Sequence, residues 1–247
     1  MKKNFSGMIK FSKIRFSFPS GDSLKVIFDN FSLRIEESSF TAMIGKNGSG
    51  KSTLAKLAAG ILKPEKGEIL IDGYKTGSKN DLKKVRRLVG LTFQNPEEQL
   101  ICTSVEREIA FELENFGVPP DEMRDIVENS LRYFKIGKYR KVVPYYLSAG
   151  EKQKVVLAAS WAIKKKYLIL DEPSSYLDPV SRKELVRLLK RMNSDGTAIL
   201  FITQFPMETL EFERLLILNK GKIIFDGNPE EGIKNKKIME RSGFPKL

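Results

Sequence analysis

The chain has 247 residues, 41% of them hydrophobic and 30% charged, which is enough for one large domain or a domain with a subdomain. Its 43 Lys and Arg against 31 Asp and Glu give a net charge of +12, which favours anionic partners such as nucleotide phosphates, nucleic acid or lipid surfaces. The single cysteine, Cys102, excludes an intrachain disulfide, and no stretch reaches the roughly 20 apolar residues of a membrane span. The charged N-terminal stretch has no long apolar core, so we expect no signal peptide.

The first third of the chain reads as strands with one helix. Alternation over residues 8–39 predicts antiparallel strands joined by a turn at 19–22. A short buried strand is expected at 39–45, followed by an amphipathic helix over 51–62 and another strand at 67–73.

The pattern from residue 81 to residue 165 is mostly helical, with clear segments at 104–117 and 121–134. The last third alternates again, and the expected elements are strands at 167–173 and 197–204, a helix at 178–192 and a hairpin over 214–227 that turns at 219–221. The last 20 residues have weak periodicity and receive no assignment. Alternating strands and helices predict an α/β fold with a doubly wound sheet.

A glycine-rich segment between the strand at 39–45 and the helix after it matches the P-loop pattern G-x-x-x-x-G-K-[ST]. Its residues are Gly45, Lys46, Asn47, Gly48, Ser49, Gly50, Lys51, Ser52 and Thr53. Backbone N–H groups of such a loop converge on phosphate oxygens, and the helix N-terminus adds partial positive charge. We expect Lys51 to reach the β- and γ-phosphates of ATP and Ser52 to bind Mg²⁺. A glycine-rich loop that binds nothing is the alternative, and the flanking strand and helix argue against it.

The apolar run at 167–170 is followed by Asp171 and Glu172, as in a Walker B strand. Asp171 would hold Mg²⁺ through its water shell, and Glu172 would polarise the attacking water. Strand ends are often acidic, so this pattern alone is weak. Together with the P-loop it predicts an ATPase.

The segment "LSAGEKQKVVLAA", from Leu147 to Ala159, resembles the signature motif of ABC ATPases, whose usual form is L-S-G-G-Q. Ala149 and Glu151 depart from that form. Ser148 and Gly150 head a helix, and a helix N-terminus binds anions. The resemblance implies that Ser148, Gly150 and Glu151 contact ATP held by a partner subunit. In isolation, a serine that caps a helix would be the preferred explanation of "LSAG", but the position between a P-loop and a Walker B strand favours the signature motif.

Other elements of the ABC family follow in order, so the resemblance covers residues 8 to about 230. It implies that Gln94 belongs to a Q-loop that contacts Mg²⁺ and water and leads to a membrane partner. It places Asp178, in "SYLDP", near a dimer interface, and Phe18 where an aromatic ring stacks on adenine. For Phe18, a core aromatic on a strand remains an equal alternative.

The same resemblance implies the domain organisation. We expect an ABC nucleotide-binding domain over 8–230, formed by a P-loop NTPase core with an antiparallel β subdomain and a helical subdomain inserted at about 95–162. A short C-terminal tail over 231–247 would follow.

Gln204 ends the strand at 197–204, where this family usually has a switch histidine. Glutamine can donate a hydrogen bond to phosphate, but it carries no positive charge and cannot relay a proton. We therefore hypothesise slower hydrolysis at this chain's own P-loop, although Gln204 could also substitute fully. Because the family's sites are shared between two subunits, the chain could pair with a different ATPase. A homodimer remains open.

The string "QNPEEQ" at 94–99 resembles the Q-loop region of ATPases in energy-coupling factor (ECF) transporters, as do 105–119 and 242–247. This implies ATP-driven uptake of a vitamin or a transition-metal ion at the cytoplasmic face of the cell membrane. The implied partners are a second ATPase, an integral membrane coupling subunit and a separate substrate-capture membrane protein. Glu97 and Glu98 could pair with basic residues of a coupling helix.

Two alternatives are the ATPase of another ABC importer and a soluble ABC ATPase that acts on nucleic acid or ribosomes. The charge of +12 supports the second, but the basic residues are spread along the chain and no long coiled coil is present. We therefore expect no nucleic-acid partner. A P-loop kinase would lack the signature helix. The sequence also ends soon after residue 240, whereas many ECF ATPases continue further, so we expect a weaker or differently built dimer contact.

Overall fold

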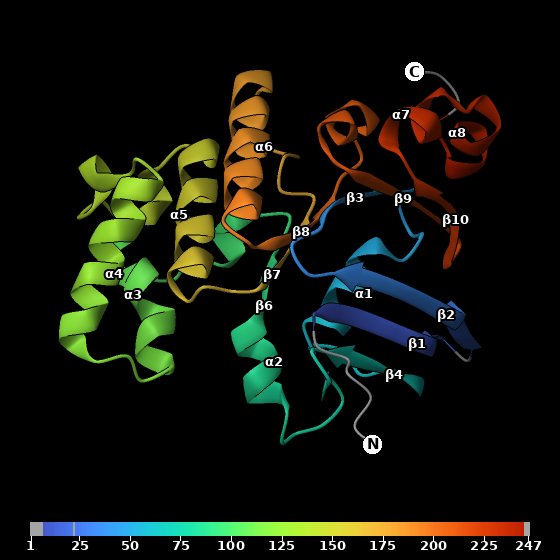
Figure 1. Ribbon diagram of the computed structural model, residues 1–247, viewed down its shortest axis with the longest axis horizontal. Coiled ribbons are helices and arrows are strands. Elements are labelled where there is room, and N and C mark those ends of the chain that lie inside the picture. Colours follow the sequence, from blue (N-terminus) through green and yellow to red (C-terminus); the bar gives the residue numbers. More distant parts are fainter. Residues whose placement is uncertain (1–6, 22, 245–247) are drawn as a thin grey trace.

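The computed structural model describes residues 7–21 and 23–244 (Figure 1). The first residues of the chain, one position of the turn at 19–22 and the last three residues of the segment 242–247 lie outside this described part.

A six-stranded sheet in the described part of the chain forms the centre of the fold, with the strand order β10-β9-β3-β8-β7-β6. All its neighbouring strands are parallel except the β9–β10 hairpin. The strands are β3 (Phe40–Ile44), β6 (Val89–Thr92), β7 (Tyr167–Asp171), β8 (Ala198–Ile202), β9 (Arg214–Asn219) and β10 (Lys222–Gly227). β3, β7 and β8 are buried along their whole length, because both faces of the sheet are covered.

A second, antiparallel sheet has the order β2-β1-β4-β5. Its strands are β1 (Met8–Ser20), β2 (Ser23–Glu36), β4 (Lys66–Ile71) and β5 (Tyr74–Lys75). One hydrophobic cluster joins this sheet, helix α1 (Lys51–Ala58) and one face of the central sheet. The antiparallel subdomain and the P-loop helix are therefore packed as one layer against the core.

The opposite face of the central sheet packs against helices through a second cluster. The remaining α-helices of the described part are α2 (Leu82–Leu88), α3 (Val105–Asn115), α4 (Pro120–Tyr133), α5 (Ala149–Ala162), α6 (Pro179–Ser194), α7 (Pro229–Lys234) and α8 (Lys236–Ser242). Short 3₁₀ helices lie at Pro96–Glu98, Gly137–Tyr139, Pro144–Tyr146 and Pro206–Glu211. Figure 1 shows α3, α4 and α5 grouped to one side as a helical subdomain. None of the described helices has the length and apolar character needed to cross a membrane.

The predicted α/β fold, with its antiparallel sheet and helical subdomain, is confirmed. Two local expectations were wrong, and one stretch had received no assignment. Strand β6 lies inside a stretch expected to be helical, because tertiary pairing with β7 holds its four residues at the sheet edge. Helix α1 ends at Ala58 rather than near residue 62, because Gly60 adopts a φ of 69° and the chain turns there. The unassigned C-terminal stretch forms α7 and α8.

Helices α7 and α8 cover the β9–β10 side of the central sheet. Met239 of α8 belongs to the main hydrophobic cluster, and Ile233 and Ile238 pack against it. Residue 231, where we placed the start of the tail, lies inside α7. The domain boundaries themselves stay a prediction.

Candidate active site

The predicted site residues come together at one edge of the central sheet. The parallel strands β3, β8, β7 and β6 are neighbours in this order. At their carboxyl ends lie Gly45, Gln204, Asp171 with Glu172, and Gln94, respectively. In open α/β sheets, ligands bind outside the carboxyl ends of the strands.

The P-loop, residues 45–53, leads from β3 into α1. A Cβ at Gly45 would lie 2.2 Å from the carbonyl oxygen of Leu218, so only glycine allows this approach to β9. Gly50 caps α1 with a φ of 112° and has no side chain to bond the first N–H groups. These donors are therefore open to an anion.

The other P-loop positions of the prediction surround this helix end. Asn47 and Gly48 are exposed, and Gly48 has a φ of 79°. Ser52 is exposed and Thr53 half-buried in the first turn of α1. The Ser49 hydroxyl oxygen is buried and has no hydrogen-bond partner among the described residues, which leaves it available to a ligand.

Lys51 is buried beneath the loop, with a side chain only 4% exposed. Its Nζ donates to the carbonyl oxygens of Gly45 at 2.8 Å and Lys46 at 3.3 Å. Burial lowers the pKa of the Lys51 ammonium, and the carboxylates of Glu172 and Asp171 offset part of this shift. The Lys51 ammonium is held in place by these oxygen acceptors, and its positive charge would complement an anionic ligand.

Glu172 follows β7 in a left-handed conformation, with a φ of 52°, and its N–H donates to the carbonyl oxygen of Ile202 at 2.9 Å. Its Oε2 accepts a hydrogen bond from Gln94 Nε2 at 3.2 Å, and its Oε1 lies 3.9 Å from Lys51 Nζ. A non-glycine residue in this region stores backbone strain, which is common at functional sites. The carboxylate is thereby aimed between the P-loop lysine and Gln94.

The residues fit a divalent cation that is bound mainly through phosphate. Burial raises the pKa of the Asp171 carboxyl, while the neighbouring Ser52 hydroxyl opposes the shift. Asp171 Oδ1 is buried and lacks a hydrogen-bond partner within the described residues. The described part of the chain contains no cluster of three or more His, Cys, Asp or Glu that could hold a metal alone. This donor set suits Mg²⁺, which usually takes one or two protein ligands plus phosphates and water.

Phe18 lies on β1 opposite Lys25 in β2, and its side chain is 38% exposed. Its ring meets that of Phe16 edge to face, with 4.9 Å between centroids. The same hairpin contacts the P-loop, since a Cβ at Gly50 would lie 2.9 Å from the Phe28 ring. An exposed ring on this hairpin is consistent with adenine stacking, which stays a prediction.

The signature residues Ser148, Gly150 and Glu151 start helix α5. Ser148 and Glu151 form a reciprocal capping box, in which Glu151 Oε2 accepts from Ser148 N at 2.9 Å and from Ser148 Oγ at 2.8 Å. Gly150 faces α6, since a Cβ there would lie 3.2 Å from Ser181 Oγ. Among the described residues, no polar contact joins these residues to the P-loop. Their contact with ATP of a partner subunit stays a prediction.

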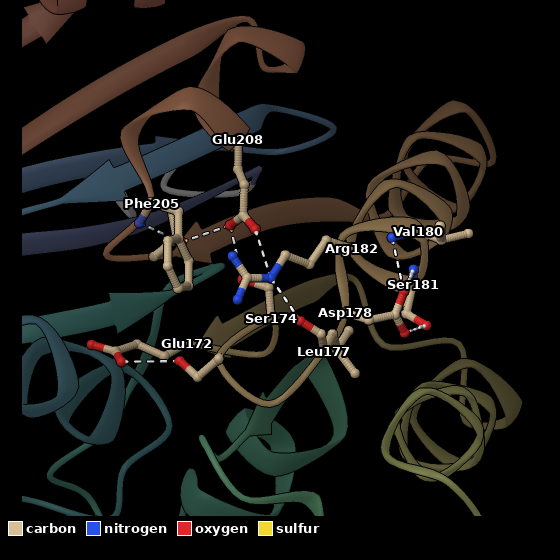
Figure 2. Close-up of polar contacts among 11 residues, drawn as sticks. Glu172, Ser174, Leu177, Asp178, Val180, Ser181, Arg182, Phe205 and Glu208 are labelled. Carbon is tan, nitrogen blue, oxygen red and sulfur yellow. Dashed lines mark hydrogen bonds and ion pairs between the residues drawn. The ribbon is translucent and has the colours of Figure 1, made fainter. Parts of the chain in front are cut away.

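Two contacts were not foreseen. Glu97, expected to face a partner, pairs with Lys152 of this same chain. Glu208 binds the hydroxyls of Thr203 and Ser174, which lie next to the ends of β8 and β7 (Figure 2). The one available signal was that Thr203 is the first polar residue after β8. No motif pointed to Glu208.

Residues 28–175 match the family model described as ABC transporter, which is more than half of the chain. The chain belongs to the ABC transporter family. It is 42% identical to the energy-coupling factor transporter ATP-binding protein EcfA1 of Fusobacterium nucleatum subsp. nucleatum, over 90% of this chain and 83% of that protein. It is 38% identical to EcfA1 of Clostridium novyi, over 89% of this chain and 79% of that protein. The resemblance to ECF ATPases is confirmed.

Solved structures of ABC ATPases agree with this assignment. CbiO1 of Clostridium perfringens, described as part of the ABC transporter complex CbiONQ, superposes with a TM-score of 0.84 at 31% identity, over 95% of this chain and 94% of that one. A bacterial ABC transporter cassette solved as a dimer superposes with a TM-score of 0.80 at 26% identity, over 90% of this chain and 98% of that one.

Proposed function

We propose that this ABC ATPase binds and hydrolyses ATP as the motor subunit of an ECF-type importer, which takes up a vitamin or a transition-metal ion. The observation that carries the proposal is the hydrogen bond of 3.2 Å from Gln94 to Glu172. It joins the segment that resembles an ECF Q-loop to the carboxylate beside the P-loop lysine. Through this contact, binding or hydrolysis of the nucleotide can change the position of the surface formed by residues 94–99.

Binding of ATP rests on the P-loop. The open N–H groups at the start of α1 and the ammonium of Lys51 face the β- and γ-phosphates. Ser52 and Asp171 would hold Mg²⁺, with Gln94 beside them, and the ion would neutralise the charge that develops on the phosphates. Phe18 stacks on the adenine ring.

Hydrolysis rests on Glu172, Gln94 and Gln204. The Glu172 carboxylate accepts a proton from the attacking water, and Gln94 fixes the direction of that carboxylate by its hydrogen bond. Gln204, half-buried after β8, donates its amide N–H to the γ-phosphate. Because an amide carries no charge, turnover at this P-loop is slower than with an imidazole.

The second half of each site comes from another ATPase subunit. Ser148, Gly150 and Glu151 approach ATP on the P-loop of that subunit, and Asp178 lies near the interface. A chain with Gln204 but an intact signature helix suits an asymmetric pair with a non-identical ATPase.

A groove of about 890 Å³ beside the Q-loop suits an integral membrane coupling subunit. Its lining includes Leu100, Ile101 and Phe111, and the Ile101 side chain is 66% exposed. An amphipathic helix of the coupling subunit would bury these apolar groups. The chain would then sit at the cytoplasmic face of the membrane, while a separate membrane protein captures the substrate.

The test is an affinity purification of the tagged chain from detergent-solubilised membranes of its own organism, with mass spectrometry of the bound proteins. A polytopic membrane protein with a second, His-bearing ATPase is the expected result. Recovery of the membrane protein without a second ATPase would support a homodimeric motor. Recovery of nucleic acid or ribosomal proteins without a membrane partner would overturn the transporter function.

A further inference from the structure

Glu208 is a largely buried carboxylate close to the carboxyl ends of β7 and β8. It lies on the 3₁₀ helix Pro206–Glu211, and its side chain is 12% exposed. Its Oε2 accepts hydrogen bonds from Thr203 Oγ1 at 2.7 Å and Ser174 Oγ at 2.8 Å. Its Oε1 lies 3.9 Å from Arg182 Nε of α6 (Figure 2).

Arg182 contacts the segment between β8 and the 3₁₀ helix Pro206–Glu211. Its guanidinium carbon lies 3.8 Å from the centre of the Phe205 ring, and its Nε donates to the carbonyl oxygen of Leu177 at 2.9 Å. Phe205 N donates to Thr203 Oγ1 at 3.1 Å. The residues before and after Gln204 are therefore both fixed by the pair of Glu208 and Arg182.

The same carboxylate also reaches the loop that carries Glu172. Ser174 lies two residues after Glu172, and the neighbouring Ser175 donates to Glu172 Oε2 at 3.3 Å. Glu208 thus bridges the turn after β8 and the loop after β7. These two segments carry the amide and the carboxylate that the proposed reaction needs in one geometry.

Stability alone explains this arrangement poorly. Glu208 Oε1 is buried and accepts no hydrogen bond within the described residues. Partly satisfied buried ion pairs contribute little net stability, since desolvation offsets their attraction. The pair does connect the segments that carry Gln204 and Glu172, through Thr203 and Ser174.

We propose that Glu208 is a positioning residue for ATP hydrolysis, which holds Gln204 opposite Glu172 through Thr203 and Ser174. Arg182 connects this bridge to the start of α6, where Asp178 caps the helix by accepting from Val180 N and Ser181 N. The inference rests on the proposed function, because it concerns the same reaction. It adds a residue that makes no contact with the nucleotide itself.

The experiment measures ATP hydrolysis at this chain's own P-loop, in the membrane complex purified through this chain with any second ATPase inactivated, in a double-mutant cycle of Glu208→Ala and Gln204→Ala. Because a misplacement of about 1 Å can cost about 10²-fold in rate, we expect Glu208→Ala to lower kcat about tenfold. The KM for ATP should change less than about twofold, because the phosphate-binding groups are untouched. In the Gln204→Ala background, Glu208→Ala should cost little more, since it acts through Gln204.

The matched control is Glu211→Ala on the same 3₁₀ helix, where Glu211 is 65% exposed and lies 4.0 Å from Lys190. It should leave kcat unchanged. Glu208→Gln keeps an acceptor oxygen for Thr203 and Ser174 but loses the charge that faces Arg182, so its kcat should fall between those of wild type and Glu208→Ala. This second variant also decides the matter if Glu208→Ala does not fold.

An equal loss from Glu208→Ala in both backgrounds, or a Glu208→Gln variant as slow as Glu208→Ala with weaker ATP binding, would mean a structural role and overturn the inference. A wild-type complex that does not hydrolyse ATP would overturn the proposed function and this inference together. An active complex with additive losses would overturn only the role of Glu208.

Discussion

The N-termini of α1 and α5 both carry a motif for phosphate, but they differ in how their first N–H groups are satisfied. At α1, the capping residue Gly50 offers no side chain, and the donors stay open. At α5, Ser148 and Glu151 form a capping box that satisfies two of the donors from within the chain. The first end therefore keeps its donors open to an anion, whereas the second already satisfies two of its donors, the N–H groups of Ser148 and Glu151, within the chain.

The two helix ends also differ in the charge of the side chain beside them. Buried Lys51 stands beside the α1 end, whereas a carboxylate, Glu151, stands at the α5 end. A hydrogen bond from Tyr139, followed by those from Ser148, lowers the pKa of Glu151 and keeps it ionised. This difference supports the proposal that the P-loop half, residues 45–53, binds nucleotide alone, while the signature half, residues 148–151, acts on ATP held by a partner. The predictions below test these two halves separately.

The largest effect should come from Glu172→Gln. Loss of the proton acceptor should reduce hydrolysis by about 10²- to 10⁴-fold, the usual contribution of a general base. ATP binding should persist, because Lys51 and the open helix end are unchanged. Steady-state hydrolysis by the membrane complex with any second ATPase inactivated, and equilibrium binding of a fluorescent ATP analogue to the separate chain, measure the two effects. A variant that keeps more than a tenth of the wild-type rate would remove Glu172 from its proposed role.

Lys51→Ala should come next. It removes the buried charge of the P-loop half and should lower hydrolysis by about 10²- to 10³-fold, as the loss of a preorganised electrostatic group does. Unlike Glu172→Gln, it should also weaken ATP binding, which titration with the same fluorescent analogue measures. Lys46→Ala is a suitable control, because Lys46 is exposed on the same loop and offers Lys51 only its main-chain carbonyl. Unchanged ATP affinity in Lys51→Ala would contradict this view of the P-loop half.

Ser148→Ala probes the signature half. Loss of the cap should cost about 1 kcal/mol of helix stability, and loss of the hydroxyl that we propose contacts the partner's phosphate should lower turnover about tenfold. ATP binding to the separate chain should not change. Ser104→Ala is the matched control, since Ser104 caps α3 by accepting from Arg107 N at 3.4 Å. It should lower thermal stability similarly without the loss of turnover. Equal turnover in the two variants would mean that Ser148 serves only as a cap.

How far the sequence predicts this molecule depends on whether a feature is local. The P-loop, the Walker B strand and the α5 cap lie within short segments whose spacing is visible in the sequence, and the structure places the first two at one sheet edge. Strand β6 was missed because its four residues carry no clear period, and only pairing with β7 makes them a strand. Helices α7 and α8 were missed because they are short and depend on packing rather than on their own propensity.

The bridge at Glu208 shows the same limit within the site. Its partners Ser174, Thr203 and Arg182 come from three different elements, and Ser174 is 34 residues away in sequence. Nothing in the spacing of these residues indicates that they meet. Pairings between distant elements follow from the fold, so the chemistry at Gln204 could be predicted only in outline.

Gln204→His should have the smallest effect. It tests whether the site at this P-loop differs from one that carries a histidine at the same position. Imidazole adds a positive charge and a proton acceptor, but the Gln204 amide already provides one hydrogen bond. We therefore expect turnover to rise only about two- to fivefold. This is well below the roughly 10²-fold contribution of a complete general base. The gain should vary between about pH 5 and 8, because histidine titrates there and glutamine does not. Gln204→Ala should lower the rate of hydrolysis if the amide contributes to it, and should leave the rate unchanged if it does not. An unchanged or lower rate in Gln204→His across this pH range would show that Gln204 substitutes fully for histidine, and the argument for an asymmetric ATPase pair would lose its chemical basis.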